Sequence, residues 1–153
     1  MNRRNMLLRA VTAVGAAFAA SRAGAATESP AQDKSQDMLK VVYHLSDFDK
    51  VPFVIGNIQN HFDGVGGPDH VTIVLVVHGP ALRAFQSAQA TPDLAQHVGR
   101  LSKAGLALAA CGNTMRSQKI GLADLLPGFV AADKGGVVRI AELQSQGYLY
   151  LRP

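Results

Sequence analysis

The sequence contains a single cysteine, Cys111, among its 153 residues. One cysteine excludes an internal disulfide, redox chemistry of the Cys-x-x-Cys kind within one chain, and the common cysteine-rich zinc sites. The five histidines show neither His-x-His nor His-x3-His spacing, so we expect no metal site. What remains for chemistry is one thiol and the polar groups around it.

Three motifs of common enzyme classes are also absent. No G-x-G-x-x-G follows the first expected strand, and no G-x-x-x-x-G-K-[ST] occurs anywhere. No sequence motif therefore indicates nucleotide binding. The absence of G-x-S-x-G argues against a serine hydrolase of the usual sheet type. We expect no cofactor.

The N-terminus has the pattern of an export signal. Arg3-Arg4 precedes a weakly apolar stretch over residues 6–20, and Ala23-Gly24-Ala25 forms a small-x-small cleavage site. We predict a cleavable, twin-arginine-like signal over residues 1–25 and a periplasmic location, with an ordinary Sec signal as the alternative. The apolar stretch is too short and too weak for a membrane span, so no stable membrane insertion is expected after cleavage.

Charge gives no indication of nucleic-acid binding. Four of the 15 basic residues and none of the 11 acidic ones lie in the expected signal, which leaves 11 of each sign in the rest of the chain. The sequence therefore predicts no basic patch and no nucleic-acid partner.

The rest of the chain alternates between strand and helix patterns. After a polar, flexible lead-in over residues 26–38, one domain is expected over residues 39–153. Five short apolar runs predict strands, and the segments between them carry apolar residues at helical spacing. The expected strands are 39–45, 70–77, 106–110, 129–132 and 148–151, and the expected longer helices are 49–62, 91–105 and 136–146. This alternation predicts an α/β fold, a three-layer α/β/α sandwich with a mainly parallel five-stranded sheet.

Three of the strands end in a polar or reactive residue. His44, His78 and Cys111 lie at or just after the ends of the first three strands, and parallel strands bring such ends to one edge of the sheet. Cys111 is the candidate nucleophile and His78 its base or hydrogen-bond partner. His44 is a weaker candidate for the same edge.

The segment after the cysteine, Gly112-Asn113-Thr114, is expected to supply binding residues for a ligand at this edge. Its composition predicts a turn, with Thr114 as the cap of a helix that begins at Met115. Backbone N–H groups at such a helix start lower a thiol pKa and favour the reactive thiolate. Gly135-Gly136 before the last helix has two interpretations, an anion cradle or a tight turn. A buried structural cysteine remains the alternative to a reactive one.

The chain resembles the DsrE/DsrF-like family of small α/β proteins linked to sulfur oxidation and sulfur relay. The most specific match is Ala110-Cys111-Gly112-Asn113-Thr114-Met115, and the similarity extends over residues 39–153. The other matching segments are 40–45, 57–60, 76–79 and 141–148. The resemblance implies a three-layer parallel sheet, association into homo-oligomers and, where the cysteine is active, a persulfide on Cys111. The relay members act in the cytoplasm, whereas this chain carries an export pattern.

The leading hypothesis is therefore a periplasmic sulfur-handling protein. Cys111 would take up sulfane sulfur as a persulfide and pass it to a thiol acceptor, so the expected partners are a small sulfur species or a thiol acceptor protein, and other copies of the chain. The first alternative is a non-catalytic homo-oligomeric module that binds a small ligand or a partner. The second is Cys–His hydrolysis, for which no orienting acid is evident from the sequence.

Overall fold

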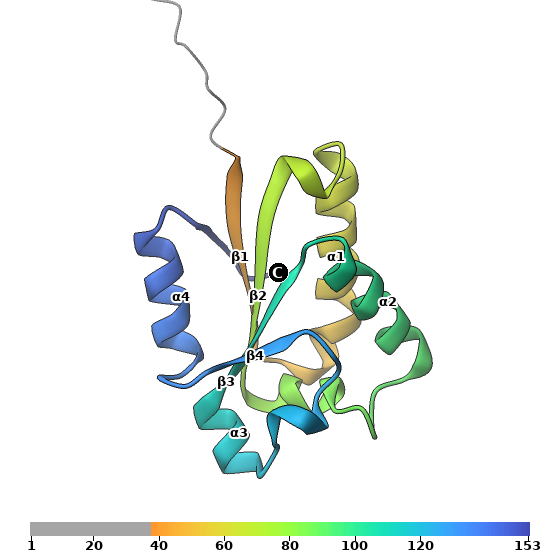
Figure 1. The fold of residues 1–153 in the computed structure, drawn as a ribbon, viewed down its shortest axis with the longest axis vertical. Helices are drawn as coiled ribbons and strands as arrows, with labels where there is room; N and C mark the ends of the chain where they lie inside the picture. Colours follow the sequence, from red (N-terminus) through yellow and green to blue (C-terminus); the bar gives the residue numbers. More distant parts are fainter. Residues whose placement is uncertain (1–37) are drawn as a thin grey trace, which may run out of the picture. The chain divides into compact units, whose positions relative to one another are not determined.

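The computed structural model describes residues 38–153, so the predicted signal at 1–25 and all but the last residue of the predicted lead-in lie outside them. Five strands form one sheet in the order β4-β3-β2-β1-β5, with every neighbouring pair parallel (Figure 1). The α/β class and the five-stranded parallel sheet are confirmed. The strands are β1 Leu39–Leu45, β2 Val71–Val77, β3 Ala107–Cys111, β4 Phe129–Ala132 and β5 Leu149–Leu151.

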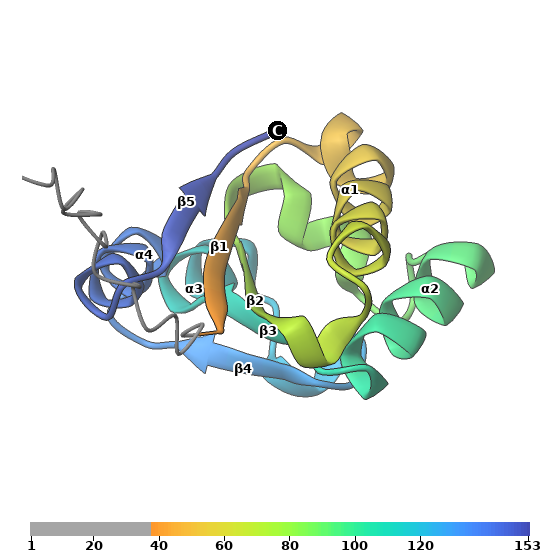
Figure 2. The same ribbon diagram turned by 90° about the horizontal axis from the view of Figure 1, so that it is seen from above.

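Helices lie on both faces of this sheet. Figure 2 shows α1 and α2 on one side of the sheet and α4 on the other. Helix α3 lies beyond the end of β3 (Figure 1). Among residues 38–153, no helix combines the length and apolar character needed to cross a membrane. The helices are α1 Val51–Gly64, α2 Pro92–Lys103, α3 Gly112–Gln118 and α4 Gly136–Ser145.

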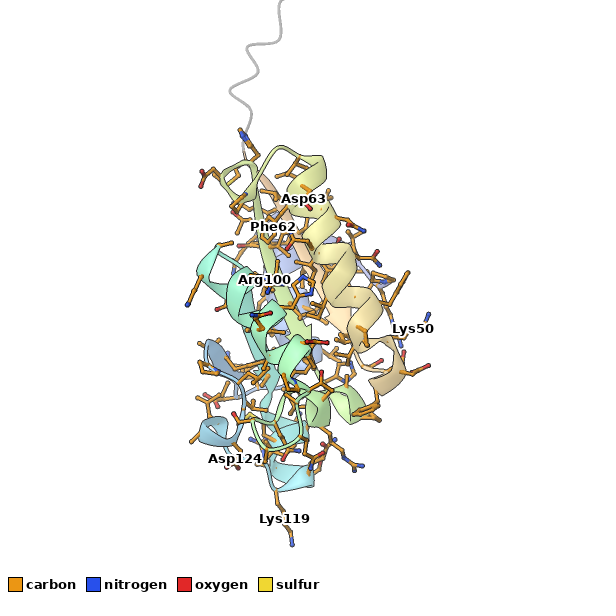
Figure 3. All side chains as sticks on the ribbon, turned by 90° about the vertical axis from the view of Figure 1, so that its right-hand side faces the viewer. Lys50, Phe62, Asp63, Arg100, Lys119 and Asp124 are labelled. Carbon is orange, nitrogen blue, oxygen red and sulfur yellow. The ribbon has the colours of Figure 1, made fainter. Side chains whose placement is uncertain are left out.

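The two faces of the sheet bury separate apolar clusters. The larger one packs between the sheet and α1 and α2, and includes Phe62, which Figure 3 labels on α1. The smaller one packs between the sheet and α4. Successive side chains of a strand point to opposite faces, so Val41 joins the larger cluster and Val42 the smaller. The smaller cluster consists of Val42, Val74, Val76, Ala109, Ile140 and Leu143.

One predicted helix start is wrong, and it lies beside the cysteine. Helix α3 begins at Gly112 rather than Met115, with Cys111 as its N-cap residue, so Thr114 lies inside the first turn and does not cap it. Glycine at position 112 allows this early start because it has no side chain. A Cβ atom there would lie only 3.0 Å from the carbonyl oxygen of Ala132. At the other end, Lys119 adopts a left-handed conformation with φ of 56° and extends away from the domain in Figure 3.

One further boundary and one helix cap also differ from the sequence prediction. The first long helix begins at Val51, because residues Phe48–Lys50 form a 3-10 turn. Helix α4 starts at the predicted Gly136, but its N-cap residue is Gly135 without a side-chain hydrogen bond, so Asp133 does not cap it. A φ of 106° at Gly135 places the chain in a conformation that glycine adopts readily, and this conformation replaces the expected side-chain cap.

The larger cluster should dominate stability. Phe85 is fully buried and its ring meets that of Phe129 edge to face, with centroids 5.3 Å apart. Phe85→Ala should lower the free energy of unfolding by about 3–5 kcal/mol, because it removes the ring and leaves a cavity. Phe53→Ala is the control, since that ring is 55% exposed, and it should cost less than about 1 kcal/mol. Urea denaturation of both variants measures this, and equal losses would contradict the assignment of the core.

Candidate functional site

The strand order places the ends of β1, β2 and β3 side by side. His44 of β1 aligns with Val76 of β2, and Val77 of β2 aligns with Ala110 of β3. His78 directly follows β2, and its N–H donates to the carbonyl of Leu45 at the end of β1. The sheet thus brings together the three strand-end residues that the sequence singled out.

All three side chains also belong to the same face of the sheet. His44 follows Val42 by two residues, His78 follows Val76, and Cys111 follows Ala109. Those three apolar residues belong to the cluster under α4. Because side chains repeat with a period of two along a strand, the site is the polar continuation of that apolar cluster.

Four donor groups act on the thiol of Cys111, a residue that is only 6% exposed. Burial raises the pKa of the thiol, but the Thr114 hydroxyl and the backbone N–H groups of Thr114, Gly136 and Asn113 together lower this pKa below its usual value. These donors come from the first turn of α3 and the start of α4. They favour the thiolate, which is the nucleophilic form of cysteine.

The Thr114 hydroxyl links the thiol to the end of β2. Its oxygen accepts a hydrogen bond of 3.0 Å from the N–H of Gly79, so its single proton is left for the sulfur. The carbonyl of Gly79 in turn accepts from the side-chain amide of Gln118 at 2.9 Å. The backbone N–H and the backbone carbonyl of Gly79 are therefore both hydrogen-bonded to side chains of α3. These bonds fix the segment after His78 relative to Cys111.

Gly136 brings α4 close to the sheet at this point. A Cβ atom on Gly136 would lie 3.3 Å from the Cβ of Cys111, 3.4 Å from a methyl of Val76 and 3.5 Å from the Cβ of His78. The N–H of Gly136 reaches the sulfur only because no side chain intervenes. Of the two interpretations of the glycine pair, the structure shows the tight turn, in which the N–H of Gly135 donates to the carbonyl of Ala132 at 2.8 Å. The backbone N–H of Gly136 acts on the protein's own thiol.

Cys111 and His78 lie on the wall of one cavity of about 270 Å³. Val137 and Val138, which are 69% and 41% exposed, contribute its apolar rim. The cavity leads from the surface to the thiol and is large enough for a small sulfur compound or the end of a cysteine side chain. Its other lining residues are Asn113, Thr114, Lys134, Gly135 and Gly136.

His44 and His78 contact each other through their Nε2 atoms, and the other ring nitrogen of His44 lies 2.6 Å from the hydroxyl of Tyr150 on β5. Burial, followed by the neighbouring His78 and the positive Arg152, lowers the pKa of His44 to about 4, although Asp47 opposes this. Burial and Arg152 also lower the pKa of His78. Both rings are therefore neutral at neutral pH.

Sequence reasoning missed two members of this group, Tyr150 and Arg152. The register of β5 pairs Tyr150 with Val42, which places it on the same face as His44. Arg152 donates to the Ser46 hydroxyl at 3.0 Å and lies 3.5 Å from Asp47. The only sequence signal was the alternation of tyrosine and leucine in residues 148–151, which does not reveal a partner 106 residues away.

The described residues offer no evident alternative chemistry. Within residues 38–153, no group of three or more His, Cys, Asp or Glu side chains is arranged to hold a metal ion. No carboxylate hydrogen-bonds to either ring of the histidine pair in this part of the chain. The arrangement provides one activated thiol, a neutral histidine pair and a small cavity between them and the surface.

The model of the DsrE/DsrF-like family matches residues 16–153, so the chain belongs to the DsrE/DsrF-like family. The protein of unknown function MTH1491 from Methanobacterium thermoautotrophicum has a similar structure, with a TM-score of 0.66 and 26% identity over 75% of this chain and 99% of that one. The ychN protein from E. coli shares the fold with a TM-score of 0.54 and 12% identity, over 75% of this chain and 100% of that one. No curated protein matches the chain.

Thr114 provides a test of the thiol environment. Thr114→Val should raise the pKa of Cys111, because it removes the hydroxyl that donates to the sulfur. It should also cost about 1–3 kcal/mol of stability, because the Gly79 N–H loses its partner. Thr114→Ser keeps the hydroxyl and is the matched control. The pH dependence of iodoacetamide alkylation reports the pKa, and an unchanged profile for the valine variant would refute the proposed hydrogen bond.

The histidine pair should make stability depend on pH. In the unfolded chain His44 takes up a proton near its ordinary pKa of 6.5, whereas in the folded protein its pKa is about 4. The unfolded state therefore binds more protons between these values, so the free energy of unfolding should fall as pH decreases through this window. His44→Gln should reduce the slope of the free energy of unfolding against pH. The reduction should correspond to at most about one bound proton. Urea denaturation at several pH values measures it, with His97→Gln as control.

Proposed function

We propose that this protein carries sulfane sulfur on Cys111 as a persulfide and transfers it to a thiol acceptor. The observation that carries the proposal is the set of four hydrogen-bond donors that lowers the pKa of the only cysteine at the base of an accessible cavity. Membership in the DsrE/DsrF-like family, whose fold is related to sulfur relay, supports the same chemistry.

Loading is a nucleophilic displacement on sulfur. The Cys111 thiolate attacks the terminal sulfur of a persulfide of the class R–S–SH. The new S–S bond forms as the S–S bond of the donor breaks, and the electron pair of the broken bond leaves as R–S⁻, which then takes up a proton. The sulfur is transferred without any external oxidant or reductant.

Unloading is the same reaction in the opposite sense. An acceptor thiol gives up its proton, and its thiolate attacks the outer sulfur of the Cys111 persulfide. The acceptor becomes a persulfide, and the electron pair of the broken bond returns to Cys111 as thiolate. The donors around Cys111 favour this step as well, because they stabilise the leaving thiolate.

We place this activity in the periplasm, in a homo-oligomer. The location rests on the twin-arginine-like pattern of residues 1–25, and the partners would then be sulfur compounds or thiol proteins of that compartment. Association with other copies rests on the family resemblance. The exposed apolar residues at the rim of the cavity, Val137 at 69% and Val138 at 41%, are compatible with such contacts.

The binding-module alternative is favoured by one observation. Cys111 is only 6% exposed, and a buried cysteine commonly acts as a small apolar residue. In that interpretation the cavity holds a small ligand or a side chain of a partner, and the thiol is part of its wall. The thiol's reactivity distinguishes the two functions.

Treatment with inorganic polysulfide should add one or more sulfur atoms to the protein, and a reductant should remove them. Cys111→Ser should abolish the addition, because the chain has no other cysteine. Intact-mass spectrometry measures both results. Absence of any addition to the wild-type protein, together with slow alkylation at high pH, would leave the binding module as the better explanation.

A second variant tests whether the cavity matters. Cys111→Ser combined with Gln144→Cys moves the thiol to an exposed position on α4, without the hydrogen-bond donors. At neutral pH this variant should load more slowly than the wild type, by about tenfold, because less of its thiol is ionised. Equal loading rates would mean that the environment of Cys111 does not contribute.

A further inference from the structure

A hydrogen-bonded chain connects the Cys111 cavity to the edge of the sheet. The hydroxyl of Tyr150 lies 2.6 Å from Nδ1 of His44, the Nε2 atoms of His44 and His78 are in contact, and His78 lines the cavity. The three residues come from β5, from β1 and from the residue after β2. Tyr150 is 40% exposed, so the chain leads from the cavity to solvent.

Resting on the proposed sulfur transfer, we propose that Tyr150, His44 and His78 form a proton relay between solvent and the Cys111 cavity. His78 exchanges the proton with the reacting thiol. His44 and Tyr150 act through His78 and are positioning residues. Each transfer of sulfur requires one proton to leave the acceptor thiol and one to reach the thiolate of the donor.

The ring nitrogens allow such a relay without any charge build-up. A neutral imidazole carries one proton on either of its two nitrogens, and both nitrogens of His44 are engaged. In one arrangement Tyr150 donates to Nδ1 of His44, and Nε2 of His44 donates to Nε2 of His78. The proton of His78 is then on Nδ1, the nitrogen left for a group in the cavity.

Delivery of that proton shifts the whole chain. His78 gives up its Nδ1 proton and takes a proton at Nε2 from His44. His44 then takes a proton at Nδ1 from the Tyr150 hydroxyl, and Tyr150 takes a proton from solvent. Every member stays neutral and the proton count balances. The reverse sequence removes a proton from an acceptor thiol in the cavity.

The charges around the pair favour neutral rings. Arg152, from the segment after β5, disfavours a positive charge on either histidine, while Asp47, from the segment after β1, partly offsets it. On the cavity side, the titratable lining groups of the described residues are Cys111 and Lys134, and the side chain of Lys134 is 79% exposed. A simple charged general acid is thus less favourable here than a relay of neutral groups.

A purely structural role is the competing explanation. Tyr150 and His44 also tie β5 to β1, and their rings lie 5.7 Å apart. Tyr150→Phe separates the two explanations, because it keeps the ring in place and removes only the hydroxyl. Tyr148→Phe is the matched control, since Tyr148 packs against the apolar cluster under α4 and is outside the hydrogen-bonded chain.

The first experiment measures sulfur transfer directly. Protein loaded with inorganic polysulfide is mixed with 2-mercaptoethanol, and loss of the added sulfur is followed by quenched intact mass from about pH 6 to pH 9. Tyr150→Phe should slow the transfer about tenfold without changing the iodoacetamide profile of unloaded Cys111, while Tyr148→Phe should match the wild type. Transfer by Tyr150→Phe at the wild-type rate across this range would overturn the relay.

The second experiment does not depend on sulfur. Nitrogen-15 spectra of the histidine rings distinguish the two tautomers, and the relay requires His44 and His78 to exchange between them in the wild type. Tyr150→Phe should shift His44 toward the tautomer protonated at Nδ1, whose Nε2 accepts from His78. Rings fixed in one tautomer in the wild type would overturn the relay, even if Cys111 carries sulfur. Exchange without any sulfur loading would support the relay and refute the proposed function.

Discussion

The site depends on the close approach of α4 to the sheet at Gly136. This approach brings a backbone N–H to the Cys111 sulfur and closes one wall of the cavity over His78. The absence of a side chain at residue 136 favours this approach, because a Cβ atom would make a tight contact of 3.3 Å with the Cβ of Cys111. The same contact joins the apolar cluster under α4 to the polar groups at the strand ends. Packing and chemistry thus share one constraint, and a change at this position alters both.

The electrostatics of the site follow from how its hydrogen bonds are distributed. Burial alone would keep the thiol protonated, and the four donors around the sulfur reverse this effect. The histidines receive no comparable partner of opposite charge, so burial and Arg152 keep them neutral. A thiol of lowered pKa beside neutral imidazoles differs from the thiolate–imidazolium pair of Cys–His hydrolases. This difference favours sulfur transfer over hydrolysis.

Much of the fold could be predicted from the sequence because its strands are short apolar runs bounded by glycine, proline or polar residues. The position of His44, His78 and Cys111 at the ends of the first three expected strands also placed them at one edge once the strands were assumed parallel. The role of Thr114 could not be predicted, because it depends on the N–H of Gly79, 35 residues away. Tyr150 was missed for the same reason, since only the register of a three-residue strand sets it beside His44. Local patterns therefore located the thiol, while tertiary contacts determined its environment.

The contact between His44 and Tyr150 joins the first strand of the domain to the last, across 106 residues. Closing a loop of that length has an entropic cost, and long-range pairings of this kind slow folding. Before that closure β1 has a free edge, and the histidine pair lacks both Tyr150 and Arg152. The site is therefore complete only when β5 has joined the sheet, and a chain truncated before β5 would contain the cysteine without Tyr150 and Arg152.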